Sequence, residues 1–90
     1  MIQRLPTLRA REVIRALERA GFVVSRTSGS HCRLIHSTDP TRKVTVPIHS
    51  DDLCRGTLRS IIAQAGLTVG EFIELIYRQD LVIAAGNRQS

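Results

Sequence analysis

The sequence has few aromatic side chains and no long apolar run. Its 90 residues include two phenylalanines, one tyrosine and no tryptophan. A base-stacking platform of the kind used by single-strand binders needs more exposed rings than these. The longest uninterrupted apolar run, residues 81–85, is far too short to span a bilayer. No long apolar core follows Arg4 and Pro6, so we expect neither a secretory signal nor a membrane partner.

Cysteine is also scarce. Cys32 and Cys54 fit reduced thiols in a cytosolic protein, which predicts a cytoplasmic location. The histidines and cysteines lack the paired spacing of zinc ligands. The sequence also has no glycine-rich phosphate loop, no nucleophile elbow and no cluster of carboxylates. We therefore expect no metal and no small-molecule cofactor.

Positive charge, in contrast, is abundant and uneven. Residues 1–45 contain nine Lys/Arg against three Asp/Glu, whereas residues 46–90 contain four against five. This excess predicts a polyanionic partner, either nucleic acid or an acidic protein that competes for the same face, with plain solubility as the alternative. Three of the arginines, Arg11, Arg15 and Arg19, are four residues apart, which stacks like charges along one helix edge. That edge either binds an anion or is a solvated face.

Apolar periodicity predicts a first helix over residues 7–20. Its buried stripe consists of Ala10, Val13, Ile14 and Leu17. Thr7 is the predicted N-cap, and Gly21 is predicted to end the helix. Three strands follow, at residues 22–26, 31–36 and 43–46. A turn over residues 27–30 with Gly29 at positive φ and a loop over residues 37–41 connect them, and Pro47 ends the pairing of the third strand.

Two further helices are predicted after the strands. The first begins at Gly56-Thr57 and ends at Gly66, with an apolar stripe formed by Leu58, Ile61, Ile62 and Ala65. The second begins with a capping box between Thr68 and Glu71, with Leu67 placed to pack on Phe72. Residues 81–83 either extend this helix or pack separately. The order α-β-β-β-α-α predicts a single α+β domain, in which the helices cover one face of a three-stranded antiparallel sheet.

Side chains that alternate along the second strand predict the composition of the open face. Cys32 and Leu34 should meet the helices, which leaves His31 and Arg33 together on the other side. Lys43 and Thr45 join them if Val44 and Val46 point inward. Cations that hold a phosphate beside an imidazole that moves a proton suit phosphodiester chemistry. The alternative is that His31 merely begins a strand.

The remaining histidines are predicted to differ in role. His36 is expected to be structural. His49 is either a second proton carrier or phosphate contact, or a residue that hydrogen-bonds the backbone before the next helix.

Four segments of the chain together resemble the HicA (YcfA-like) family of bacterial toxins. They are residues 15–22 (RALERAGF), residues 29–31 (GSH), residues 44–47 (VTVP) with His49, and residues 56–61 (GTLRSI) with residues 65–67 (AGL). The resemblance runs from about Leu8 to Ile76. It implies a fold like that of double-stranded-RNA-binding domains, and a metal-independent endonuclease that cleaves messenger RNA.

The resemblance also implies the site and the partner. His31, the histidine of the Gly-Ser-His motif, corresponds to the catalytic residue of the family. RNA contacts are expected from the residues around it: Arg26, Gly29, Ser30, Arg33 and Lys43. The implied partner is a HicB antitoxin that covers the active face and helps to repress the operon. Two other functions stay open, namely an RNA-binding domain without catalysis and a structural subunit that binds only an acidic protein.

Overall fold

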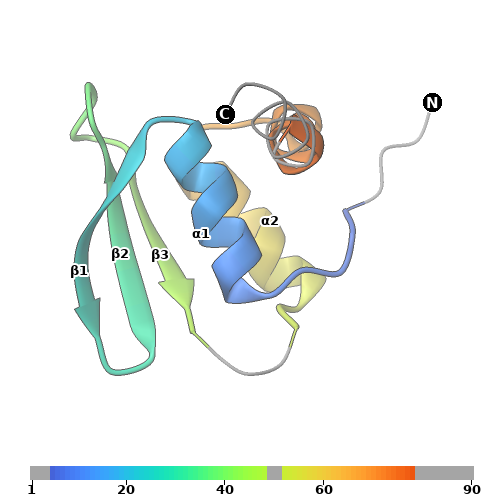
Figure 1. The fold of residues 1–90 in the computed structure, drawn as a ribbon, viewed down its shortest axis with the longest axis horizontal. Coiled ribbons are helices and arrows are strands. Elements are labelled where there is room, and N and C mark those ends of the chain that lie inside the picture. The colour runs from blue at the N-terminus through green and yellow to red at the C-terminus, as the bar shows by residue number, and fades with distance from the viewer. Residues whose placement is uncertain (1–4, 49–51, 79–90) are drawn as a thin grey trace, which may run out of the picture.

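The computed structural model describes residues 5–48 and 52–78. Helix α1 (Ala10–Arg19) precedes strands β1 (Phe22–Ser28), β2 (His31–His36) and β3 (Lys43–Pro47), and helix α2 (Arg55–Gln64) follows them. A third helix covers Val69–Arg78. The three strands form one antiparallel sheet in the order β1-β2-β3, with the helices on one face (Figure 1). The predicted α+β class and element order are confirmed.

The core lies between the sheet and the helices. Cys32 and Leu34 of β2 and Val44 and Val46 of β3 are buried, as the strand alternation predicted. The helices contribute the other large buried side chains: Val13, Leu17, Leu58, Ile61, Ile62 and Phe72. Because this one face of the sheet takes all the packing, the other face is left to solvent.

Helix α1 begins later than the sequence predicted. Its first residue is Ala10, and Arg9 rather than Thr7 occupies the N-cap position. The Glu12 carboxylate accepts a hydrogen bond of 3.0 Å from the Arg9 backbone N–H, which satisfies a donor at the helix start without Thr7. The end is as predicted, because Gly21 takes a φ of +99° directly after the last turn.

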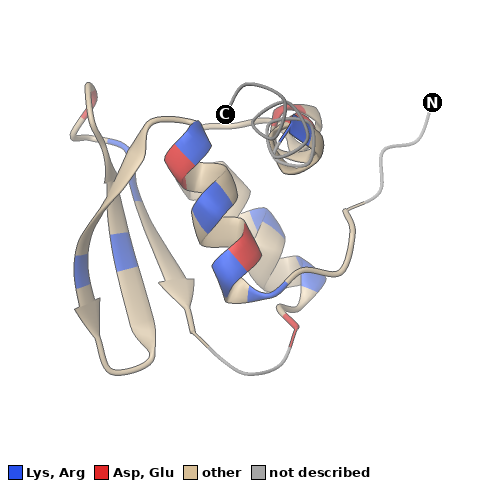
Figure 2. Cartoon of the chain, viewed as in Figure 1, with Lys and Arg blue, Asp and Glu red and all other residues tan. Residues whose placement is uncertain are grey.

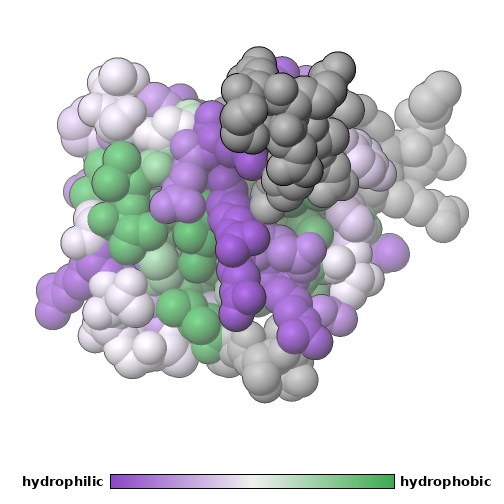
Figure 3. Space-filling model, in the orientation of Figure 1, coloured by the Kyte–Doolittle hydropathy of each residue, from purple (hydrophilic) through white to green (hydrophobic). Residues whose placement is uncertain are grey.

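The exposed side of α1 carries the three arginines spaced four residues apart, Arg11, Arg15 and Arg19. Figure 2 shows basic and acidic residues mixed along this helix, and Figure 3 shows hydrophilic side chains in a line over it. Since α1 packs on the covered face of the sheet, this line of charge lies away from the open face.

The hairpin between β1 and β2 is tighter than predicted. Strand β1 continues to Ser28, two residues beyond the predicted end, because Thr27 and Ser28 pair with Cys32 and His31. The connection is therefore only Gly29-Ser30, with Gly29 at a φ of +57° as predicted. Strand β2 has its predicted bounds, and β3 gains one residue because Pro47 still lies opposite His31.

The last two helices follow their predicted signals closely. Helix α2 begins at Arg55, one residue before Gly56, and Gly66 ends it at a φ of +73°. The capping box is confirmed: the Thr68 N–H donates to Glu71 at 2.8 Å, and the Glu71 N–H donates to Thr68 Oγ1 at 3.1 Å. The prediction for residues 81–83 lies outside the described residues.

No single helix within residues 5–48 and 52–78 is long and apolar enough to cross a membrane. The pair formed by α2 and the third helix, bent by 97°, meets that test by length and composition only.

Candidate active site

The open face of the sheet is arranged as three cross-strand rows. The pairing register places one residue from each strand in every row. From the hairpin end, the rows are Ser28–His31–Pro47, Arg26–Arg33–Thr45 and Val23–Ile35–Lys43. None of these nine residues is acidic. The face therefore changes along the strands from a histidine row, through an arginine row, to a row that is mainly apolar.

A β-bulge at Ser25 builds the arginine row. Val24 pairs with Leu34 and Arg26 pairs with Arg33, so Ser25 has no partner in the register. Strict alternation would have put Arg26 on the covered face with Phe22 and Val24. The extra residue reverses the alternation of side chains, so Arg26 lies on the same face of the sheet as Arg33. Bulges commonly redirect side chains in this way. The Ser25 hydroxyl donates to the Arg33 carbonyl at 3.3 Å, which ties the bulge to β2.

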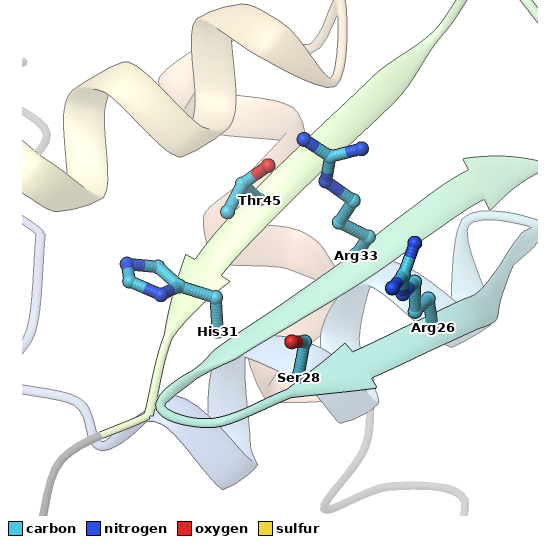
Figure 4. A pocket seen from close by; sticks show the side chains of 5 residues that line it. All are labelled: Arg26, Ser28, His31, Arg33 and Thr45. Carbon is cyan, nitrogen blue, oxygen red and sulfur yellow. The ribbon is translucent and has the colours of Figure 1, made fainter.

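A hollow of about 440 Å³ lies over the first two rows. It is lined by Arg26, Ser28, His31, Arg33 and Thr45, whose side chains project from the same side of the sheet (Figure 4). His31, Arg26 and Arg33 thus come together, although they are up to seven residues apart in the sequence. Figure 2 shows the two basic positions of β1 and β2 side by side.

The other residues predicted for the site lie around this hollow. Gly29 and Ser30 form the exposed turn directly before His31 and do not line it. Lys43 lines a second hollow of about 260 Å³, which shares Arg33 and Thr45 with the first. His49 lies outside the described residues.

The polar groups of the hollow are available to a ligand. Within residues 5–48 and 52–78, the side chains of His31, Arg26 and Arg33 are exposed and make no hydrogen bond or ion pair. The ion pair in that part of the chain joins Arg9 to Asp52 at 3.7 Å, on other elements. An imidazole and two guanidinium groups with unused donors can bind a phosphate and transfer a proton beside it.

His36, at the other end of β2, is structural, as predicted. Its Nε2 lies 3.0 Å from the Ala20 carbonyl, and its Nδ1 accepts a bond of 3.2 Å from the Thr38 N–H. A carbonyl accepts only, so Nε2 carries the proton in the neutral ring. The ring also meets Phe22 edge-on, with the ring centroids 5.0 Å apart. Both ring nitrogens of His36 therefore have hydrogen-bond partners, whereas the His31 ring has none among the described residues.

Ser28 was missed as a site residue by sequence reasoning, which placed it in the turn. The signal that could have found it is the Gly29-Ser30 pair, because a two-residue hairpin turn puts the preceding residue opposite His31. Among the described residues, no three His, Cys, Asp or Glu side chains come together as a metal site.

The fold and the site define a class: a small α+β domain whose open sheet face presents one histidine beside paired arginines. The model of the family described as HicA toxin of bacterial toxin–antitoxin matches residues 10–67, which is more than half of the chain. The chain therefore belongs to the HicA toxin family, as its motifs predicted. The match spans α1, the whole sheet and α2. A search of curated proteins found no match. Membership makes the chain a toxin of a toxin–antitoxin system and implies an antitoxin partner.

Proposed function

We propose that this protein is a metal-independent endoribonuclease that cleaves messenger RNA in the cytoplasm, with His31 as its general acid/base. The observation that carries the proposal is the hollow in which His31 lies with Arg26 and Arg33, all three without other polar partners among the described residues. The fold's likeness to double-stranded-RNA-binding domains is part of the same proposal.

In the proposed reaction, neutral His31 takes the proton of a ribose 2′-hydroxyl. The 2′-oxygen then attacks the adjacent phosphorus, and the bond to the 5′-oxygen breaks, so that the products are a 2′,3′-cyclic phosphate and a 5′-hydroxyl. Arg26 and Arg33 bind the phosphate and stabilise its developing charge. The leaving oxygen takes its proton from water or from a second carrier, for which His49 is our candidate. Requirement for the 2′-hydroxyl confines the reaction to RNA.

The proposed partner is a HicB-like antitoxin that covers the open face. An acidic surface on the antitoxin would match Arg26, Arg33 and Lys43, because no acidic side chain lies in the three rows of this face. Such a complex hides His31 and explains how a cell tolerates the toxin. Gly29 and Ser30, at the exposed tip of the hairpin, are proposed to contact RNA through the backbone when the antitoxin is absent.

The test is cleavage of a single-stranded RNA oligonucleotide by the wild type and by His31→Ala. We expect the substitution to lower the rate by about 10²- to 10⁴-fold, the usual contribution of a general acid/base. The product should end in a 2′,3′-cyclic phosphate, and EDTA should leave the rate unchanged. Equal cleavage by a folded His31→Ala protein would refute the role of His31. RNA binding without cleavage by the wild type would favour a non-catalytic RNA-binding domain.

A matched pair of arginine variants tests the site itself. Arg33 and Arg15 are both exposed, but Arg33 lines the hollow and Arg15 lies on α1, on the covered side of the sheet. Arg33→Ala should slow cleavage by at least tenfold, whereas Arg15→Ala should leave it within about twofold of the wild type. If both variants lose activity equally, overall charge rather than this hollow determines activity.

A further inference from the structure

The second hollow on the open face continues the first one along the strands. It is lined by Ser25, Arg33, Leu34, Ile35, Lys43, Val44 and Thr45. Arg33 and Thr45 line both hollows, so the two form one track from the histidine row to the apolar row. Along β2 this track passes His31, Arg33 and Ile35, which are about 7 Å apart from one to the next.

The apolar side chains of the row at the end of this track do not pack in the hydrophobic core. Val23 is 56% exposed, and its cross-strand partner Ile35 is only half-buried. Both belong to the face that carries no helix. Ile35 adjoins two cations, Arg33 in the neighbouring row of β2 and Lys43 across the sheet on β3, and Val23 lies on the other side of Ile35 from Lys43. Apolar area flanked by cations is suited to a ligand that is flat and apolar in one part and anionic in the next.

We propose that this row is a nucleotide subsite for single-stranded RNA. The base of the nucleotide next to the cleaved phosphate lies on Val23 and Ile35, and Lys43 binds the following phosphate. The inference rests on the proposed function, because it takes the cleaved phosphate to lie beside His31 and Arg33. One strand step of about 7 Å is close to the length of one nucleotide, so phosphate and base can occupy neighbouring rows. The subsite replaces aromatic stacking with aliphatic contact, in a chain with only three aromatic residues.

RNA fits this row better than an apolar protein segment does. Arg33 and Lys43 both adjoin Ile35, and Val23 lies beyond it, so a base on the apolar pair projects sideways from phosphates at the two cations, as bases do from the backbone of a nucleic acid strand. It also continues directly from the hollow that holds the proposed reactive phosphate. Binding of the antitoxin at Val23 instead is an outcome that the experiment below distinguishes.

The test compares two adjacent valines on opposite faces of one strand. Val23 belongs to the apolar row, whereas Val24 pairs with Leu34 on the covered face and is 38% exposed. Binding of a single-stranded RNA octamer is measured by fluorescence anisotropy in the non-cleaving His31→Ala background. Val23→Ser should weaken the affinity about fivefold, the effect of losing roughly 40 Å² of apolar contact. Val24→Ser should leave the affinity unchanged.

Two further measurements separate base contact from charge. Polyphosphate, which has phosphates and no bases, should bind the Val23→Ser protein as well as its parent. Lys43→Gln should reduce the slope of log affinity against log salt by about 0.7, the value for one phosphate contact to a single strand. Val23→Thr, with a residue that strands prefer, repeats the test if Val23→Ser fails to fold, and the expected loss is then about threefold.

The possible failures differ from one another. If the wild type cleaves RNA but Val23→Ser and Val24→Ser bind the octamer equally, the subsite is wrong and the proposed function stands. If Val23→Ser leaves RNA affinity intact but weakens the complex with a HicB-like antitoxin, the row is a protein contact and the subsite is again wrong. If the wild type neither binds nor cleaves RNA, the proposed function itself fails.

Discussion

Gly21 joins α1 to β1 at a point where a side chain would meet His36. Its φ of +99° lies in the left-handed region, which L side chains rarely adopt. A Cβ at this position would lie 2.9 Å from His36 Nε2 and 3.3 Å from its Cε1. The His36 ring has little room to move, because it bonds the Ala20 carbonyl on one side and the Thr38 N–H on the other.

We expect Gly21→Ala to lower the free energy of unfolding by about 1–2.5 kcal/mol. The left-handed backbone costs an alanine about 1–2 kcal/mol. Displacement of the ring adds about 1 kcal/mol for the lost bond to Ala20. The lower conformational entropy of the unfolded alanine chain offsets about 0.4–1 kcal/mol of this destabilisation. Gly29 provides the matched control, because its φ is +57° and nothing lies within 4 Å of its added Cβ. Gly29→Ala should cost about 0–1.5 kcal/mol, which is about 1 kcal/mol less than Gly21→Ala because no ring is displaced.

The measurement is urea unfolding of the three proteins, followed by circular dichroism. A His36→Ala background should reduce the cost of Gly21→Ala toward that of Gly29→Ala, because the ring that clashes is gone. Equal destabilisation by the two glycine variants in the His36 protein would refute the reasoning, since it would show that the ring yields at no cost.

Two other expectations concern the loop between β2 and β3. Arg42 donates through Nε and Nη2 to the Ala65 carbonyl at 2.9 and 2.7 Å, so Arg42→Ala should lower the free energy of unfolding by about 1.5–3 kcal/mol in the same assay, and Arg42→Lys by less. The hydrogen bond from the Thr41 hydroxyl lowers the pKa of Asp39 below its ordinary value. The contribution of ionised Asp39 to the free energy of unfolding should therefore be complete above about pH 3.9. It should disappear as the pH falls through the folded-state pKa, which NMR titration measures directly. Thr41→Val should raise the Asp39 pKa toward its ordinary value, because it removes the hydroxyl donor, and no change would contradict the assignment.

Much of this fold follows from local patterns. Helical spacing marked the buried side of α1 and α2, although a hydrogen bond from Arg9 to Glu12 moved the start of α1 past Thr7. Alternation along β2 correctly separated Leu34 from Arg33, because a strand of six residues without a bulge has a strict period of two. These signals act over a few residues and need no knowledge of the partner element.

The sequence by itself thus determined the α+β class, the family and the exposure of His31 on the open face of the sheet. Only the tertiary structure decided what surrounds His31. Arg26 and Ser28 lie on the same face as His31 because Ser25 is an extra residue in β1. Val23 precedes this bulge, and it pairs with Ile35 on the same open face. A bulge is a property of the register between two strands, and no local pattern in β1 marks its position. The unpaired Ser25 therefore decides whether Arg26 lies on the covered face of the sheet or in the candidate active site.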